Sequence, residues 1–502
     1  MKKNRLYTAI LMAAALVATS CSDFTDIKPK GKNLLSTTDQ LELLFNNDIN
    51  LPLSDVYNIG GDVINGANQI PAELAMPNKE RTTLLWSYSD SPADIQRIQQ
   101  LTSSDGYYSS CYKWVGRICN PVITNASLAS GSEQKKAALV AEAKALRSYA
   151  HFLLVNKFAK AYNPETAKQD GGVIYMTEDK SIDEIYAPGT VAQVYEQCLR
   201  DVNDAINSGA LPKVQPTKVR FNLPAAYALK ANILMCMQQY PEAAEAAEAA
   251  LALEGGLDDY YANVRQEPRW LEYIHVMPDF KYDCFTSDYL ESVENYFVIP
   301  NYLLGLWSEP ALEAQIEPQY GHFFLTPRVK EQYNLFYTIL AGGTTDQSNN
   351  QIGLRNWDSP DNMPNMMEYH NVAGLATPQM YILLAECYVR GGDIDKGMDQ
   401  LDHLRKYRLP ADSFAPLKGT VTDKADAIQH IKQTSLGENI WTVWNFIQRK
   451  RWNVQPEWQT TLTHDFGELG TVTLSPTSDL WVFPFPLSVI QGNPNVHYNY
   501  NN

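Results

Sequence analysis

The chain lacks the short motifs that mark the common enzyme classes. It contains no G-x-S-x-G nucleophile elbow, no H-E-x-x-H metalloprotease pair, no P-loop and no G-x-G-x-x-G dinucleotide fingerprint. Ser110 and Lys113 fit an S-x-x-K spacing, but the companion S-D-N and K-T-G motifs are missing. The sequence therefore predicts no catalytic residue and no cofactor. With 57 acidic residues, a carboxylate pair placed for glycoside hydrolysis stays an open alternative.

Cysteine is scarce, with seven residues, and none shows Cys-x-x-Cys or Cys/His metal-ligand spacing. A metal site is therefore not predicted. Cys198, Cys236 and Cys387 lie in helical patterns and are expected to be small buried residues. Cys111 and Cys119, eight residues apart, are candidates for a disulfide that the sequence alone leaves open.

Positive charge is also in short supply. The chain has 41 Lys and Arg against 57 Asp and Glu, a formal net charge of −16, and no basic cluster offsets it. Such a surface repels phosphate backbones, which excludes nucleic acid as an expected partner.

Long hydrophobic runs are missing except at the start of the chain. The apolar run Ala9–Ala18 follows a basic start and is shorter than the about 20 residues of a membrane-spanning helix. Residues 1–20 are therefore predicted to be a signal peptide. Cys21 follows in LVATSC, which resembles a bacterial lipobox, and is the predicted lipid anchor. An ordinary secretory signal beside a chance Cys is the alternative.

Helical patterns dominate the remainder and predict a mostly α fold. In the segment 140–158, Tyr149, Phe152 and Leu153 share one face with small residues, which favours close helix packing. A short helix capped by Ser36 or Thr37 precedes it. Further helical patterns lie at 94–125, 191–206 and 424–452.

Two helix pairs, at 222–253 and 378–406, repeat one pattern at an offset of 154 residues, so that Ala231 matches Ala385. Each pair resembles a tetratricopeptide unit of about 34 residues. Such units bury their apolar faces only by stacking, so the separated copies are expected to meet in space.

Two long segments, 51–92 and 254–377, are irregular: the first is rich in Asn, Pro, Gly and Asp, and the second has many aromatic residues. Loops of this length are uncommon unless they are functional. Aromatic faces with a few polar groups suit neutral sugars. The predicted ligand-binding residues are Asp62, Arg81, Trp86 and Tyr88 from the first segment and Trp270, Tyr289, Tyr296 and Trp307 from the second. Packing within the loops is the alternative for each ring.

Other aromatic residues are assigned to the core or to the tail. Four tryptophans in helical or tail motifs are predicted to be core residues: Trp114, Trp441, Trp444 and Trp481. The tail from Trp481 onward contains closely spaced prolines, which exclude a helix interior or a central strand there. It is expected to lie as an extended segment over the repeats.

Four stretches carry a family resemblance. They are Cys21 with the following SDFTDIKPKG, AEAKALRSYAHFLLVNKFAKAY (141–162), MYILLAECYVRGGDIDKGMDQLDHLRKYR (380–408) and VFPFPLSVIQGNPN (482–495). In this order they resemble the SusD/RagB family of outer-membrane nutrient-binding lipoproteins. The family's central motif falls on Glu142, Leu146, Arg147 and the pair His151-Phe152. A later charged segment is reduced to Glu438 and Arg449–Arg451, which we expect to be structural.

The resemblance implies a tetratricopeptide-like helical platform with an irregular ligand-binding face. It also implies a lipoprotein on the exterior of the outer membrane, held there through lipid alone. The implied partner is a SusC-like TonB-dependent transporter, to which the protein passes glycan without catalysis. A peptide ligand is the alternative on the same architecture, and a secreted hydrolase is the alternative of another class.

The expected organisation is a single domain behind its export signal. It comprises a signal peptide at 1–20, a lipidated linker at 21–35, and one SusD-like α domain at 36–502. Within that domain we distinguish an N-terminal repeat part at 36–253, a loop-rich insertion at 254–377, and a C-terminal repeat and tail at 378–502.

Overall fold

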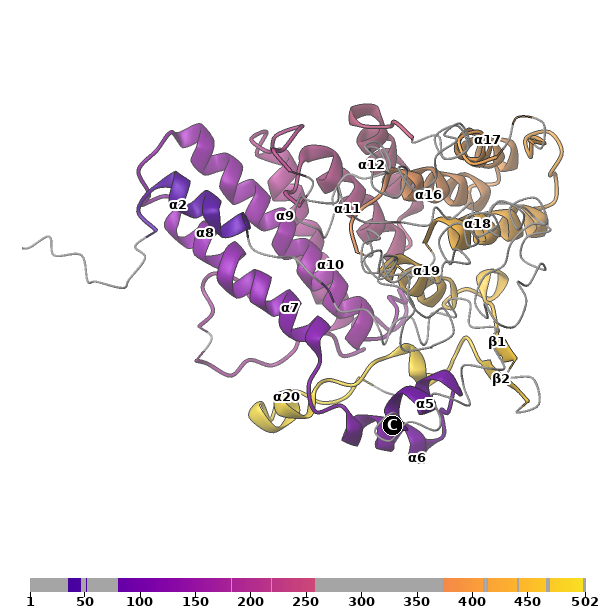
Figure 1. Cartoon of the computed structure of the whole chain (residues 1–502), viewed down its shortest axis with the longest axis horizontal. Coiled ribbons are helices and arrows are strands. Elements are labelled where there is room, and N and C mark those ends of the chain that lie inside the picture. Colours follow the sequence, from indigo (N-terminus) through magenta and orange to yellow (C-terminus); the bar gives the residue numbers. More distant parts are fainter. Residues whose placement is uncertain are drawn as a thin grey trace, which may run out of the picture.

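A computed structural model describes residues 35–46, 51, 80–181, 183–217, 219–257, 373–409, 411, 414–439, 442–465 and 470–499. The helices are α2 (Thr38–Glu42), α5 (Glu80–Trp86), α6 (Pro92–Leu101), α7 (Gly106–Trp114), α8 (Asn120–Asn125), α9 (Glu133–Phe158), α10 (Val191–Asn207), α11 (Leu223–Cys236), α12 (Tyr240–Leu253), α16 (Thr377–Arg390), α17 (Ile394–Arg405), α18 (Lys424–Asn439), α19 (Val443–Trp452) and α20 (Leu487–Gly492). Strands β1 (Leu462–Asp465) and β2 (Thr471–Leu474) pair antiparallel, with Leu462 opposite Leu474. The predicted mostly α class is confirmed (Figure 1).

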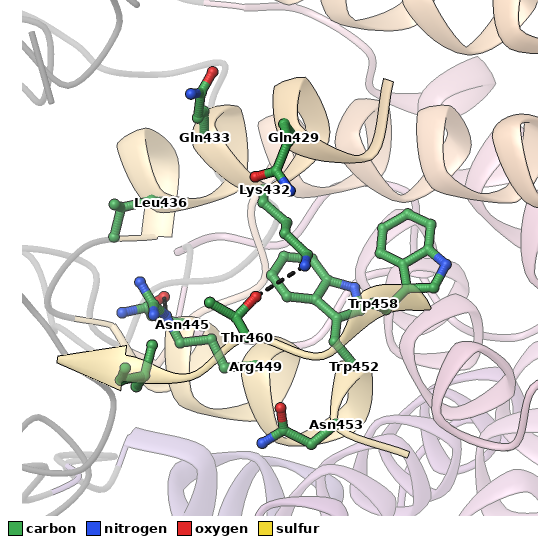
Figure 2. Close-up of a pocket in the computed structure, with 11 residues that line it drawn as sticks. Gln429, Lys432, Gln433, Leu436, Asn445, Arg449, Trp452, Asn453, Trp458 and Thr460 are labelled. Carbon is green, nitrogen blue, oxygen red and sulfur yellow. Dashed lines mark hydrogen bonds between the residues drawn. The ribbon is translucent and has the colours of Figure 1, made fainter. Parts of the chain in front are cut away.

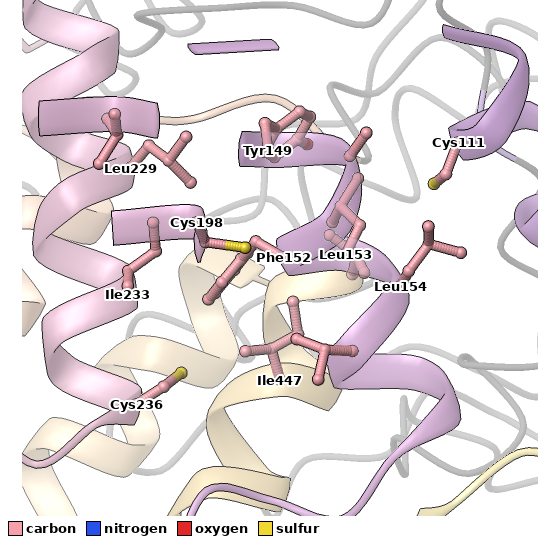
Figure 3. Packing of buried hydrophobic residues seen from close by; sticks show 14 of the residues in the cluster. Cys111, Tyr149, Phe152, Leu153, Leu154, Cys198, Leu229, Ile233, Cys236 and Ile447 are labelled. Carbon is pink, nitrogen blue, oxygen red and sulfur yellow. The ribbon is translucent and has the colours of Figure 1, made fainter. Parts of the chain in front are cut away.

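Helix α9 is the element on which the first half of the fold packs. Ser132 caps its start, where the hydroxyl accepts the N–H of Lys135 at 3.2 Å. Every side chain from 145 to 158 is buried, and α7, α8 and α10 pack around the helix. Figure 3 shows Phe152 and Leu153 of α9 beside Ile233 of α11 and Ile447 of α19. The helix predicted at 140–158 is confirmed, and it begins earlier, at Glu133.

The two helix pairs match each other closely in their bounds. Helices α11 and α16 begin and end at the predicted offset of 154 residues, and α12 and α17 begin at the same offset. Helix α12 packs against α16, so the separated copies meet in space as expected. Pro241 lies in the first turn of α12, where its missing N–H costs no hydrogen bond.

Two predicted helical regions are broken into shorter pieces. The region 94–125 contains α6, α7, a π-helical turn at Val115–Cys119 and α8. The region 424–452 contains α18 and α19. Thr442, in an extended conformation, is the N-cap of α19, and its hydroxyl donates to the carbonyl of Asn439 at 2.7 Å. That local bond turns the chain where side-chain periodicity alone suggested one continuous helix.

The tail is extended for only a few residues and packs on α9 and α19. The N–H of Phe483 donates to the Lys157 carbonyl of α9 at 3.0 Å. Phe485 stacks on Phe158, with ring centroids 5.5 Å apart, and Phe446 of α19 packs against Trp481. After Pro486 the chain forms the short helix α20, which the sequence analysis missed.

The described cysteines are buried and free. This answers the question left open for Cys111 and Cys119, which form no disulfide and whose pKa values are raised by burial. The prediction of small buried residues is confirmed for Cys198, Cys236 and Cys387.

Three of the four tryptophans assigned to the core are confirmed there. Trp114, Trp444 and Trp481 are at most 4% exposed, and Trp441 lies outside the described residues. No helix in the part of the chain that the structure describes has the length and apolar character needed to cross a bilayer.

Candidate ligand-binding sites

The charged residues of the first helical motif are enclosed in the core. Glu142 accepts from Nε and Nη2 of Arg220 at 2.5 and 2.6 Å. Arg147 donates to both carboxylate oxygens of Asp201 at 2.6 and 3.0 Å. Both motif residues are at most 3% exposed. They join α9 to α10 and to the segment before α11.

A second buried network surrounds Glu386 of α16. Its carboxylate accepts from both terminal nitrogens of Arg451 at 2.6 Å, from Arg390 Nε at 2.7 Å and from Trp452 Nε1 at 2.9 Å. Burial alone would raise the pKa of this carboxyl, but the charges of Arg451 and Arg390 lower the pKa to about 2. Arg451 therefore has the structural role expected for it.

Glu438 is structural as well. It accepts from Nε of the fully buried Arg408 at 2.7 Å, an ion pair between α18 and the end of the second repeat. Arg449 differs from Arg451, because its side chain lines a pocket.

Two of the predicted ligand-binding residues are described: Arg81 lies in α5, and Tyr88 lies just after it. Arg81 Nε donates to Thr102 Oγ1 at 2.8 Å, which ties α5 to the end of α6. Tyr88 follows α5 with a φ of 49° and is 4% exposed within the larger core. A stacking role for Tyr88 would require this ring to leave the core.

The remaining predicted ligand-binding residues cannot be placed. The backbone of Trp86 ends α5, and its side chain lies outside what the structure describes. The others lie outside the described residues altogether: Asp62, Trp270, Tyr289, Tyr296 and Trp307. Their role stays a prediction.

A pocket of about 130 Å³ opens between α18, α19 and the segment leading into β1 (Figure 2). The residues lining it are Gln429, Lys432, Gln433, Leu436, Asn445, Arg449, Trp452, Asn453, Trp458, Thr460 and Leu462. Lys432 Nζ donates to Thr460 Oγ1 at 2.8 Å and to the Gln459 carbonyl at 3.3 Å. Arg449 Nε donates to Asn445 Oδ1 at 2.9 Å.

Comparison with known proteins gives this fold a family context. Residues 35–235 match a SusD-like family model described as starch-binding and associating with the outer membrane. Over these residues the chain is similar to the SusD-like family. The matched segment contains α2, the α5–α6 hairpin and α9 with its Glu142 and Arg147 pairs. No curated protein matches the chain in sequence.

Solved structures share the SusD-like fold over nearly the whole chain. A SusD superfamily protein from Bacteroides thetaiotaomicron matches with a TM-score of 0.57 at 16% identity, covering 93% of this chain and 100% of that one. A SusD superfamily protein from Bacteroides fragilis matches with a TM-score of 0.58 at 15% identity, covering 92% and 99%. A SusD-like carbohydrate binding protein from Bacteroides vulgatus matches with a TM-score of 0.54 at 14% identity, covering 93% and 98%.

Sequence reasoning missed the pocket between α18 and α19. One signal was available in the sequence. Gln429, Lys432 and Gln433 are three and four residues apart, so they form a polar face on α18. The other walls come from α19 and from the segment after it, and only the tertiary fold brings these to α18.

Proposed function

We propose that this SusD-like chain is a surface lipoprotein that binds oligosaccharide and passes it to a TonB-dependent transporter without catalysis. The observation that carries the proposal is the match of residues 35–235 to a family described as starch-binding and associating with the outer membrane. The lipobox-like sequence at Cys21 supports a lipid anchor, and the net charge of −16 argues against nucleic acid.

The buried carboxylates support a carrier role over a hydrolytic one. Glu142, Asp201 and Glu386 are each held by an arginine. A glycosidase needs two carboxyl groups facing the same sugar, one of them available to donate a proton. The acids that stand out in the recognised motifs are instead engaged in ion pairs between helices.

The expected affinity is weak. Two or three aromatic stacking contacts, each contributing about 0.5–1.5 kcal/mol beyond burial, leave roughly −4 to −6 kcal/mol after the costs of association. That corresponds to dissociation constants between about 1 mM and tens of micromolar. Closure against a transporter would retain such a ligand by raising its effective concentration.

Calorimetry of the mature chain with oligosaccharide and peptide panels tests the ligand class. Binding of at least one oligosaccharide is expected, and binding of peptides alone would replace the sugar assignment with the peptide alternative.

Replacing Trp86, Trp270 or Trp307 by Ala should weaken sugar binding about two- to tenfold, because each change removes one stacking contact. Tyr186→Ala, on a half-buried ring outside both predicted segments, is the control.

Purification from membranes tests the partner. Mild detergent extraction of the lipidated chain is expected to recover a large β-barrel transporter with it. Recovery of the chain as a monomer would contradict the partner assignment. Turnover of a bound glycan, abolished by one carboxylate substitution, would favour the hydrolase alternative.

A further inference from the structure

Exposed aliphatic side chains gather at one end of the molecule. Among the described residues, the exposed large hydrophobic side chains are those of Leu43, Leu128, Ile185 and Val214. All of these except Ile185 belong to segments around the N-terminal part of α9, where Leu128 and Val214 are 81% and 82% exposed. Single exposed hydrophobic residues are ordinary, whereas a group of them marks a surface that meets another molecule or a membrane.

Backbone hydrogen bonds join the turn that carries Leu128 to the start of α2. Ser130 donates its N–H to the Ser36 carbonyl at 2.7 Å, and its own carbonyl accepts the N–H of Thr38 at 2.9 Å. Leu43 follows α2 directly along the chain. Figure 1 shows α2 and α8 side by side at the left of the picture, and both contact α9.

Two contacts bring the loop that carries Val214 to the same end. Gln215, the next residue, donates to the carboxylate of Glu142 in α9 at 3.1 Å. Arg220, which follows the loop, pairs with Glu42, the last residue of α2, at 3.3 Å. The three exposed side chains therefore stand on segments that pack around the N-terminal part of α9.

The segments with the most exposed side chains carry little charge. Residues 118–132, which include Leu128, contain no charged side chain. Residues 205–241, which include Val214, contain no acid, although the whole chain has 57 acidic residues. Lys213, the exposed neighbour of Val214, is basic.

Acidic residues at this end form ion pairs with lysines. Asp39 and Glu42 each pair with Lys135 at 2.7 Å, and Glu133 pairs with Lys136 at 2.8 Å. Moving paired charges and neutral groups into a less polar environment costs less than moving unpaired charges. This end is therefore suited to contact with a surface that is partly apolar.

The predicted anchor joins the described part of the chain at the same end. The described chain begins at Leu35, fourteen residues after Cys21. Because an extended chain covers at most about 3.6 Å per residue, lipid attached to Cys21 would lie within about 50 Å of Leu35. The surface around α2 is the part of the described chain nearest to the anchor along the sequence.

Protruding aliphatic side chains suit a lipid surface better than a protein partner. Side chains that are four-fifths exposed stand out from the body of the protein. A protein that packs against them must supply complementary pockets, whereas a fluid bilayer closes around each side chain. Apolar groups inserted among lipid headgroups gain free energy because they leave water.

We propose that the end of the molecule around α2 lies on the lipid bilayer, with Leu43, Leu128 and Val214 inserted among the headgroups. The contact depends on the lipid anchor of the proposed function to bring this end to the membrane. It adds a second attachment, whereas the family resemblance implies attachment through lipid alone. Three inserted side chains would also fix the orientation of the tethered protein, because three points define a plane.

Sedimentation with phosphatidylcholine vesicles tests the contact. The full mature chain with Cys21→Ala carries no acyl group, so binding must come from its surface. Half of this chain is expected to bind between about 1 and 10 mM lipid, more weakly than a single myristoyl chain at roughly 0.1 mM. Binding this weak leaves the chain in the soluble fraction of cells. No binding at about 20 mM lipid would overturn the proposal.

A triple variant of the Cys21→Ala chain locates the binding. Leu43→Ser, Leu128→Ser and Val214→Ser together should raise the lipid concentration needed by at least about tenfold, because each change removes an inserted aliphatic group. Ile185→Ser is the matched control, because Ile185 is 57% exposed in the separate loop before α10. Equal binding by the parent chain and the folded triple variant would overturn the assignment.

The outcomes separate this contact from the proposed function. If the Cys21→Ala chain binds no vesicles but wild-type Cys21 carries lipid, the anchor stands and the membrane contact fails. If the chain binds vesicles through these side chains but Cys21 carries no lipid, the contact stands and the anchor fails. If the triple change instead removes a co-purified transporter from the lipidated chain, without vesicle binding, this end is a protein interface and the lipid assignment is overturned.

Discussion

Charged residues lie at the centre of this molecule as well as on its surface. Glu142, Arg147, Glu386 and Arg451 are all at most 8% exposed, and each has an oppositely charged partner within 2.6 Å. Removing one member of such a pair leaves a buried charge without compensation, which is far more costly than breaking an exposed pair. The recognised motif charges therefore act on the stability of the helical body.

Glu386→Gln is expected to lower the free energy of unfolding by about 3–5 kcal/mol at pH 7, because Arg451 would keep its buried charge without a carboxylate. Urea denaturation of wild type and variant measures the loss. Asp399→Asn, which breaks the exposed pair with Lys418, should change little and serves as the control. A loss below about 1 kcal/mol for Glu386→Gln would contradict the network described here.

The same carboxyl gives a prediction about acid. Its folded pKa of about 2 lies below the usual 4.5, so its contribution is complete above about pH 4.5 and is lost as the pH falls through about 2. The gap in unfolding free energy between wild type and Glu386→Gln should therefore narrow from pH 5 toward pH 2. Denaturation series at pH 5, 4 and 3 check this, and a constant gap would refute it.

Lys450 makes stability rise with pH as well, but in an alkaline range. Its ammonium donates to the Asn156 and Ala159 carbonyls at the end of α9, at 2.7 and 2.5 Å, and burial lowers its pKa to about 7. Between about pH 7 and 10.5 the unfolded chain binds a proton that the folded chain does not, so stability rises with pH there.

The stability of wild type relative to Lys450→Met should accordingly increase from pH 7 to pH 9.5. Chemical denaturation at three pH values in that range measures the difference. The Lys418→Met variant, altered at a half-exposed lysine, should show no such trend relative to wild type. A flat difference for Lys450→Met would mean that the buried amine keeps its ordinary pKa.

At the scale of elements, the turns inside the two helix pairs reveal the repeat most clearly. Gln238 and Gly392, at the common offset of 154 residues, both have positive φ, 62° and 90°. The N–H groups after them bond back equivalently, from Gln239 to the Leu234 carbonyl and from Asp393 to the Tyr388 carbonyl. Both copies therefore reverse the chain with one left-handed residue.

Gly392→Ala tests the importance of that conformation. A Cβ at this position would meet no heavy atom within 4 Å, so the change acts through backbone strain and should destabilise by about 1–2 kcal/mol. Gly391→Ala is the matched control, because Gly391 has an ordinary φ of −75° and the substitution should be neutral or slightly stabilising. Thermal unfolding compares them, and equal melting temperatures would contradict the argument.

At the scale of the whole molecule, the lipid anchor predicted at Cys21 is expected to hold the chain at the membrane. Cys21→Ala is expected to move the protein from the membrane fraction to the soluble fraction, because the acyl chains that hold it would have no attachment point. Fractionation with immunoblotting measures this, and mass spectrometry of the wild-type N-terminus should show the lipid. Ser22→Ala is the control. Retention of Cys21→Ala in the membrane would argue for attachment by another route.

The recurring helical patterns were enough to predict most of the architecture. The predicted helices form in α9, in α10 and in the two matched pairs. Periodicity found them because a helix that buries one face must repeat its apolar residues every three or four positions. Breaks such as that before Thr442 escaped prediction, since they depend on single side-chain hydrogen bonds. The tail helix α20 is too short for periodicity to detect.

The sequence by itself determined the mostly α class of this protein, because the helix periods and the motifs that predicted its fold are local patterns that can be read along the chain. Only the tertiary structure decided what the charged residues do. Glu142 meets Arg220, and Glu386 meets Arg451, across 78 and 65 positions of chain. It also set Arg449 and Lys432, from different helices, around one pocket. Local patterns constrain neighbours in sequence, whereas ion pairs and pockets depend on which distant helices pack together.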